Sequence, residues 1–326
     1  MNEEYIRKLP KIELHCHLDG SISLEMLNRL AGKIVDEASV QAPVPCGSLK
    51  QYLQCFSVVL PLLQTKEALR LAAWDVVRQA AEEHVIYIEV RFAPAFHCEQ
   101  GLTEMDACRA VVQGLQKGEE DFGVQSRAIV CMMRGLSAEQ NERTLHCADQ
   151  LRDQGIAGLD LAGDEAAYPT ELYRSLFEKA RDLGLLFTIH AGECGSAKNV
   201  NDAIDLGARR IGHGVAAAGH EEILNLCREK NICFEMCPVS NLQTKAVTDL
   251  QDYPFLPMQK AGLAVTIHTD NRTVSGTTLT KEWMTLLKAF PEITEDNIRK
   301  ANLAAAQAAF LPEKDKSRLI QRLSSK

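Results

Sequence analysis

Four histidines and one aspartate lie where short apolar runs of the sequence end. His15 and His17 are two residues apart in KIELHCH, so on a strand their side chains share one face. His190 belongs to HAGE, His213 to GHG and Asp270 to HTDN, each at the end of a later run. Neutral imidazoles and carboxylates are ligands for transition metals. The HxH pair alone is weak evidence, but together the five residues predict a metal site if the ends of their runs meet.

The runs that carry these residues recur along the chain and alternate with helical patterns. They are short, apolar and often rich in β-branched residues, as expected of parallel strands covered on both faces. Eight such runs are present, at 11–17, 85–92, 125–133, 156–163, 185–192, 209–214, 232–238 and 263–270. This alternation favours an α/β fold, a (β/α)8 TIM-type barrel rather than an open sheet. The carboxyl ends of the strands would then meet at one mouth, where the catalytic groups of such barrels collect.

The segments between the runs carry the sequence signals of helices. Thr103 and Asp106 form a capping-box pattern before ACRAVVQGLQKG, and Gly184 stands where a helix C-cap glycine belongs. Residues 20–84, between the first and second runs, form the longest connection and contain several helix-like pieces. We expect this helical insertion after strand 1 to cap the C-terminal mouth of the barrel. The alternative is an extra helical layer on the outside.

Composition limits the class of protein. The 326 residues are 46% hydrophobic and 25% charged, without a repeat or a linker-like segment, which predicts one domain over residues 1–326. The net charge of -8 argues against nucleic acid and against an anionic membrane surface as partners. The charged start MNEEYIRKLPK lacks the apolar core of a secretory signal, and the eleven cysteines form no paired framework. We therefore expect a reduced, cytoplasmic protein that does not span a membrane.

A set of motifs, in order along the chain, resembles the adenosine/AMP deaminase family of metal-dependent amidohydrolases. The motifs are KIELHCHLDGS, RFAP, DLAGDE, HAGE, RIGHG, CPVSNLQT and HTDN. The resemblance extends from Lys8 to the final helices and implies a (β/α)8 barrel that holds one zinc ion (Zn2+) per chain. Carried over by position, it makes the zinc ligands His15, His17, His190 and Asp270.

The resemblance also implies hydrolytic attack on a 6-aminopurine. His213 would orient or deprotonate the attacking water, with Asp270 also in reach. Glu193 would donate a proton to ring nitrogen N1, because addition at C6 otherwise builds up negative charge on the ring. That role requires a carboxylic acid that stays protonated near neutral pH through burial. Without its neighbours, Glu193 would be expected to be a solvated loop carboxylate.

Four residues are implied to contact the substrate. Asp19 would accept a hydrogen bond from a ribose hydroxyl, with His17 close by, and Gly163 would let its backbone amide approach purine N3. Asn271 departs from the family pattern, in which many members have a second Asp after the metal-binding one. A neutral amide can donate to purine N7, whereas an ionised carboxylate cannot. The departure changes the expected N7 contact and need not abolish activity.

The expected function is zinc-dependent hydrolysis of adenosine, and of 2'-deoxyadenosine, to inosine or deoxyinosine and ammonia in purine salvage. One alternative is a relative that deaminates another 6-aminopurine, such as adenine or a modified adenosine. Another is a non-catalytic nucleoside-binding relative, against which the intact set of ligand-type residues argues. The expected partner is a small-molecule substrate, and the sequence predicts no particular oligomeric state.

Overall fold

The computed structural model describes residues 1–43, 46 and 49–324. Its strands coincide with the runs predicted from the sequence, although the later strands are shorter than their runs. They are β1 (Lys11–His17), β2 (Val85–Phe92), β3 (Gln125–Met133), β4 (Ile156–Ala162), β5 (Thr188–Ala191), β6 (Arg210–His213), β7 (Cys233–Met236) and β8 (Ala264–Ile267). Gly163, Gly192 and Gly214 directly follow β4, β5 and β6 with positive φ, which ends each strand.

Helices occupy the connections. Before β1 lies α1 (Glu3–Lys8), and between β1 and β2 lie α2 (Leu24–Ala31), α3 (Glu37–Val40), α4 (Leu49–Leu53), α5 (Phe56–Val59), the 3-10 helix η1 (Leu60–Leu62) and α6 (Lys66–Glu82). The later connections hold η2 (Pro94–His97), α7 (Glu104–Phe122), α8 (Ala138–Leu151), η3 (Arg152–Gln154), η4 (Thr170–Tyr173), α9 (Arg174–Asp182), α10 (Ala197–Leu206), η5 (Val215–Ala217), α11 (Glu221–Glu229), α12 (Pro238–Gln243), η6 (Leu250–Asp252) and α13 (Phe255–Lys260). After β8 come α14 (Leu279–Ala289), α15 (Glu295–Ala308) and α16 (Glu313–Ser324). None of the described helices is long and apolar enough to cross a membrane.

Local capping signals set helix boundaries. In α7 the predicted capping box forms, because Thr103 Oγ1 accepts from Asp106 N at 3.1 Å and Asp106 Oδ2 accepts from Thr103 N at 3.3 Å. Gly123 ends the same helix with φ +71°. Gly184 follows α9 with φ +70°, as its predicted C-terminal position requires. Short-range signals therefore account for where these helices start and stop.

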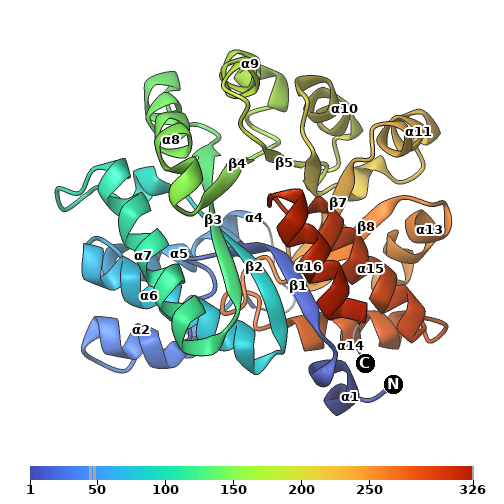
Figure 1. Ribbon diagram of the computed structural model, residues 1–326, viewed down its shortest axis with the longest axis horizontal. Helices are drawn as coiled ribbons and strands as arrows, with labels where there is room; N and C mark the ends of the chain where they lie inside the picture. Colours follow the sequence, from blue (N-terminus) through green and yellow to red (C-terminus); the bar gives the residue numbers. More distant parts are fainter. Residues whose placement is uncertain (44–45, 47–48, 325–326) are drawn as a thin grey trace.

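All eight strands run parallel and close into a barrel. Strands β1 to β4 pair in chain order, and so do β5 to β8. A bridge between Leu159 and Phe187 joins β4 to the residue before β5, and one between Cys16 and Asp270 joins β1 to the segment after β8. Figure 1 shows the strands at the centre with the helices around them. The predicted (β/α)8 barrel is confirmed.

Helices α15 and α16 cover the N-terminal end of the barrel. Ile12 and Leu14 of β1 form a buried cluster with Leu311 and Leu319, which belong to this C-terminal region. In Figure 1, α16 (red) lies across the end of the strands nearest the viewer. Because apolar contacts bury this end, we expect the functional site at the C-terminal end of the strands.

The insertion between β1 and β2 reaches the C-terminal end of the strands. Its residues Tyr52, Phe56 and Leu60 line a cavity together with residues that follow several strands. Gln64 ties the insertion to the connection after β2, since its Nε2 donates to Leu60 O and Phe96 O, both at 2.9 Å. The insertion thus supplies part of the wall of this cavity.

Candidate metal centre and active-site cavity

The ends of three strands and one loop bring the predicted ligand residues together. His15 and His17 lie on β1, His190 on β5, and His213 at the end of β6. Asp270 lies beyond β8, where its N–H donates to His15 O at 2.8 Å and its carbonyl accepts from His17 N at 2.7 Å. His213 and Asp270 have left-handed backbones, with φ of +63° and +58°. Such strain in non-glycine residues clusters at functional sites.

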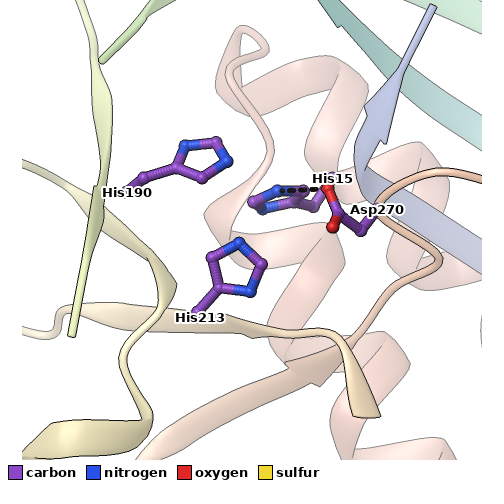
Figure 2. Close-up of side chains that lie close together, drawn as sticks. All are labelled: His15, His190, His213 and Asp270. Carbon is purple, nitrogen blue, oxygen red and sulfur yellow. Dashed lines mark ion pairs between the residues drawn. The ribbon is translucent and has the colours of Figure 1, made fainter. Parts of the chain in front are cut away.

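His15, His190, His213 and Asp270 form a compact group of metal-type donors, called the metal group below. One donor atom from each lies within 4.8 Å of the others, and all four residues are buried. Figure 2 shows the four side chains gathered together, with an ion-pair contact between His15 and Asp270. His17 Nε2 lies beside them, 3.2 Å from His190 Nε2 and 3.4 Å from Asp270 Oδ1. The structure therefore brings all the predicted metal-site residues together.

Two buried atoms in the metal group lack a hydrogen-bond partner. They are His15 Nε2 and Asp270 Oδ1, which lie 3.4 Å apart. A buried polar atom without a partner is unfavourable by about 1–3 kcal/mol, so two neighbouring ones call for a further partner. A cation would satisfy both, and imidazole with carboxylate is a donor set that transition metals accept. The residues present fit a bound metal ion.

Buried carboxylates determine which ring nitrogen of two histidines faces the metal group. Glu235 Oε2 lies 2.8 Å from His15 Nδ1, and Asp160 Oδ2 lies 2.9 Å from His190 Nδ1. Each carboxylate accepts a hydrogen bond from Nδ1–H. The neutral ring therefore carries its lone pair on Nε2. His15 and His190 are therefore oriented as ligands.

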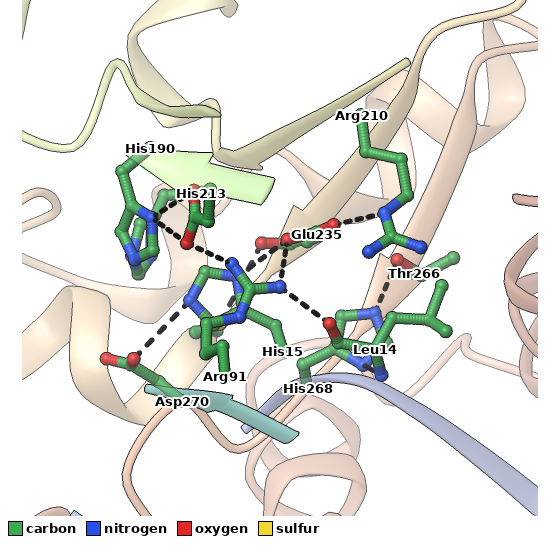
Figure 3. A network of polar contacts seen from close by, with 12 residues as sticks. Leu14, His15, Arg91, His190, Arg210, His213, Glu235, Thr266, His268 and Asp270 are labelled. Carbon is green, nitrogen blue, oxygen red and sulfur yellow. Dashed lines mark hydrogen bonds and ion pairs between the residues drawn. The ribbon is translucent and has the colours of Figure 1, made fainter. Parts of the chain in front are cut away.

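Two buried arginines hold these carboxylates in place, and Figure 3 shows both of them beside Glu235. Arg91 donates to Asp160 Oδ2 and to Glu235 Oε2, each at 2.8 Å. Arg210 Nη2 donates to Glu89 Oε2 at 2.6 Å. Arg210 Nε lies 2.5 Å from Glu235 Oε1, an ion pair without hydrogen-bond alignment. Because a buried charge needs such partners, the network fixes the carboxylates that orient the histidines.

The same surroundings shift the ionisation of the metal group. Burial, with the nearby Arg91 guanidinium, lowers the pKa of His15 to about 4. Burial opposes ionisation of Asp270, but the close contact with the His15 imidazole and the charges of neighbouring imidazoles hold its pKa well below the ordinary value. Burial also disfavours protonation of His190, yet the Asp160 carboxylate outweighs it and raises the pKa of His190. Neutral His15 and ionised Asp270 are the forms that bind a cation.

His213 is held in a different way. Asn241 Nδ2 lies 2.9 Å from His213 Nδ1, while the Tyr253 hydroxyl donates to Asn241 Oδ1 at 2.9 Å. Since the amide nitrogen donates, Nδ1 accepts, and the neutral ring carries its proton on Nε2. Ser240, also on α12, donates to Asp270 Oδ2 at 2.5 Å. His213 is thus presented as a donor, whereas His15 and His190 are presented as acceptors.

A cavity of about 400 Å³ adjoins the metal group. Its wall includes the predicted catalytic and substrate-binding residues, namely His17, Asp19, Gly163, Glu193, His213, Asp270 and Asn271. Glu193 Oε2 lies 3.7 Å from His213 Nε2, and the Glu193 side chain is 12% exposed. Burial raises the pKa of Asp19 to about 6. The predicted residues therefore surround one space of small-molecule size.

Asn271 lies against the backbone of the first connection. A Cβ atom on Gly20 would lie 1.8 Å from Asn271 Oδ1, so that position requires glycine. The Asn271 side chain is buried, and its Oδ1 has no hydrogen-bond partner. The atom without a partner is therefore an acceptor, which could receive a hydrogen bond from a donor group of a ligand. Gly163, which also lines the cavity, has φ +105°, which favours glycine there as well.

Sequence reasoning missed the polar residues that support the metal group. The motifs RFAP, DLAGDE, RIGHG and CPVSNLQT contain Arg91, Asp160, Arg210 and Asn241, but predict no role for them, and Glu235 lies outside these motifs. A signal was present, because Arg91 and Glu235 interrupt apolar runs. A charge within a buried strand needs a buried partner, so such residues mark an internal network.

Residues 10–326 match the family model described as adenosine deaminase. The chain is 47% identical over 332 residues to the adenosine deaminase of Enterococcus faecalis, covering 99% of this chain and 98% of that protein. It is 41% identical over 337 residues to the adenosine deaminase of Lactococcus lactis subsp. lactis, covering 99% and 95% respectively. Both alignments span essentially the whole chain.

Solved structures share the fold. An Arabidopsis N6-mAMP deaminase superposes with a TM-score of 0.88 at 27% identity, covering 99% of this chain and 100% of that chain. The adenine deaminase of Arthrobacter aurescens gives a TM-score of 0.86 at 25% identity, covering 97% and 98%. The motifs, the barrel and the metal group agree with the sequence comparisons, and the chain belongs to the adenosine deaminase family.

Proposed function

We propose that the protein hydrolyses adenosine and 2'-deoxyadenosine to inosine or deoxyinosine, with release of ammonia, as a step of purine salvage. The observation that carries this proposal is the convergence of the metal group and Glu193 on one cavity of about 400 Å³. The relatives at 47% and 41% identity are named adenosine deaminase, which supports adenosine over other 6-aminopurines as substrate.

We assign one zinc ion per chain to His15, His17, His190 and Asp270. His15 and His190 offer Nε2 lone pairs because their Nδ1 atoms face carboxylates. His17 Nε2 lies 3.4 Å from Asp270 Oδ1, which lacks a hydrogen-bond partner. Imidazole nitrogen and carboxylate oxygen are ligands that zinc accepts. When bound, zinc lowers the pKa of a coordinated water and so provides a nucleophile near neutral pH.

We assign His213 to the attacking water rather than to the metal. Asn241 accounts for this choice, because its amide leaves the His213 proton on Nε2. That N–H can donate to the water oxygen and aim it at purine C6. Asp270 is the acceptor for the water proton, and its other oxygen is held by Ser240.

We assign Glu193 as the acid that protonates purine N1. C6 and N1 are bonded neighbours, so the groups that serve them must also be neighbours. Glu193 Oε2 lies 3.7 Å from His213 Nε2, which meets that requirement. Protonation of N1 neutralises the charge that builds up when water adds at C6. The C6–N bond then breaks as Asp270 gives its proton to the amine, which leaves as ammonia, and the C6 hydroxyl returns a proton to Glu193 to form inosine.

The substrate contacts follow from the residues on the cavity wall. Asp19 accepts a hydrogen bond from a ribose hydroxyl, with His17 on the same side. Gly163 brings its backbone amide to N3, and the Asn271 amide donates to N7. An ionised Asp19 carboxylate disfavours a phosphorylated substrate at this wall.

We also infer a single domain over residues 1–326 in a reducing compartment such as the cytoplasm. The cysteines that the structure describes form no disulfide bond with one another. Most are buried as small apolar side chains, which suits a compartment that keeps thiols reduced.

The test is zinc content measured beside adenosine turnover in the wild type and in Glu193→Gln. The amide cannot protonate N1, so we expect kcat to fall by about 10²- to 10⁴-fold while bound zinc stays near one per chain. Adenosine, 2'-deoxyadenosine, adenine and AMP are compared by ultraviolet absorbance. Faster turnover of adenine or AMP than of adenosine would favour the alternative substrate, and full activity of Glu193→Gln would remove its acid role.

A further inference from the structure

One buried carboxylate holds the turn that carries Glu193. Glu165, in the connection between β4 and β5, is 2% exposed. Its Oε1 accepts from Gly192 N at 2.6 Å, and its Oε2 accepts from Glu193 N at 2.9 Å and Cys194 N at 3.1 Å. Successive backbone N–H groups that converge in this way form an anion-binding nest. Here the anion is a side chain of the protein itself.

Asn199 supplies a further donor to Glu165. Its Nδ2 donates to Glu165 Oε1 at 2.9 Å, and its Oδ1 accepts from Thr170 N at 3.1 Å. Asn199 lies in the first turn of α10, directly after the turn that carries Glu193. Thr170 starts η4, in the same connection as Glu165. The Glu165 carboxylate therefore joins the connections after β4 and β5 into one unit.

The turn depends on this carboxylate because its backbone is unusual. Gly192 has φ +77°, and a Cβ there would lie 2.7 Å from Val200 Cγ2. Among the hydrogen bonds of the described residues, the N–H groups of residues 192–194 all donate to Glu165. A carboxylate that accepts several N–H groups is a stronger anchor than a neutral acceptor, since bonds to charged groups are about twice as strong.

We propose that Glu165 is a positioning residue for proton donation: it fixes the 192–194 turn so that the Glu193 carboxyl group stays beside His213, at 3.7 Å. The inference rests on the acid role proposed for Glu193. In Glu165→Gln, an NH2 group replaces one oxygen and faces two N–H donors. The turn then loses about half of its anchoring hydrogen bonds, although the side chain keeps its size.

The first measurement is steady-state kinetics of zinc-loaded Glu165→Gln with adenosine. A displacement of about 1 Å at a reacting group lowers rates by up to about 10²-fold, so we expect kcat to fall by about 10- to 10²-fold. KM should change by less than about threefold, because the Glu165 side chain does not itself line the cavity. Bound zinc, measured by metal analysis, should stay at the wild-type level, since no zinc ligand contacts Glu165 through its side chain.

The decisive measurement is the double variant with Glu193→Gln. If Glu165 acts through Glu193, adding Glu165→Gln to that background should change kcat by less than about twofold. We also measure the Kd of a 6-hydroxy-1,6-dihydropurine nucleoside for the same variants. This ligand carries an N1–H that can donate a hydrogen bond to the Glu193 carboxylate. Glu165→Gln should weaken this Kd by about 10-fold in the wild-type background and leave it unchanged in the Glu193→Gln background. A merely structural role would weaken both backgrounds equally.

Glu83→Gln is the matched control. Glu83 is also a buried glutamate that accepts a backbone N–H, that of Thr280 at 2.9 Å, but it lies just before β2 at the opposite end of the barrel. We expect it to lower the melting temperature and leave kcat unchanged. Should Glu165→Gln not fold, Asn199→Ala removes one donor from the same carboxylate, and kcat should fall by about 3- to 10-fold in the wild-type background alone.

The outcomes separate this inference from the proposed function. Wild-type kcat in folded Glu165→Gln, beside an inactive Glu193→Gln, would overturn the positioning role and leave the proposed function intact. An equal loss of kcat in both backgrounds would overturn it as well. Full activity of Glu193→Gln would remove the acid role and the positioning role together.

Discussion

Substitution of Glu235 by glutamine tests whether the buried charge network orients the metal ligands. Glu235 Oε2 accepts from His15 Nδ1 and from Arg91 Nη2, both at 2.8 Å, while Oε1 lies 2.5 Å from Arg210 Nε. Glutamine keeps the shape but has one acceptor oxygen, and its NH2 group must face a donor. Either His15 or a guanidinium therefore loses its partner.

The expected magnitude follows from these contacts. A hydrogen bond to a charged group contributes about 1.5–3 kcal/mol, and loss of a carboxylate that orients a metal-binding histidine lowers metal affinity by about 10- to 100-fold. These ranges agree, because 1.4 kcal/mol corresponds to about 10-fold. In this variant Arg91 still donates to Asp160, and Arg210 still donates to Glu89. Breaking a buried ion pair lowers the free energy of unfolding by about 3–5 kcal/mol, and we expect a loss near the lower end of that range.

The assay is competition for zinc against a chelating indicator at neutral pH, run with urea unfolding. Glu89→Gln is the matched control, because Glu89 pairs with Arg210 in the same network and contacts none of the predicted ligands. We expect both variants to be less stable, and only Glu235→Gln to bind zinc more weakly. Wild-type zinc affinity in Glu235→Gln, or an equal loss in both variants, would refute the orienting role.

Three other perturbations test separate parts of the structure. Gly20→Ala places a Cβ 1.8 Å from Asn271 Oδ1, so Asn271 must move; we expect steady-state KM for adenosine to rise about 10-fold with bound zinc unchanged. Asn241→Asp makes Nδ1 of His213 a donor and strips the proton from Nε2, so kcat should fall by up to about 10⁴-fold, and an unchanged kcat would exclude the orienting role. Burial raises the pKa of Glu282 to about 8, so the folded protein retains a proton that the unfolded chain has released. The free energy of unfolding, from urea melts, should therefore fall as pH rises from about 5 to 8, and Glu282→Gln should lack that slope.

Much of the site was predictable because its signals are local. His15 and His17 share a face through strand parity alone, and each other predicted ligand ends its own run. Parallel strands in a barrel place equivalent ends together, so position along each run was enough to predict that the residues meet. The structure places them within reach of one another, as expected.

The supporting residues could not be predicted in this way. Arg91 and Glu235 are 144 residues apart, and their contact at 2.8 Å depends on the register of β2 and β7 and on closure of the barrel. Glu165 and the 192–194 turn belong to different connections, whose conformations no strand or helix period describes. By residue type alone, Glu165 and Glu193 resemble ordinary surface acids.

The amino-acid sequence by itself therefore determined the kind of fold, the mouth at which chemistry occurs and the side chains that meet there, since all three depend on periodic patterns and strand ends. Only the tertiary structure decided which nitrogen of each histidine faces inward and which carboxylate holds the Glu193 turn. The physical reason is that tautomers and hydrogen-bond geometry depend on atoms brought within about 3 Å by distant segments, and no local pattern encodes that approach.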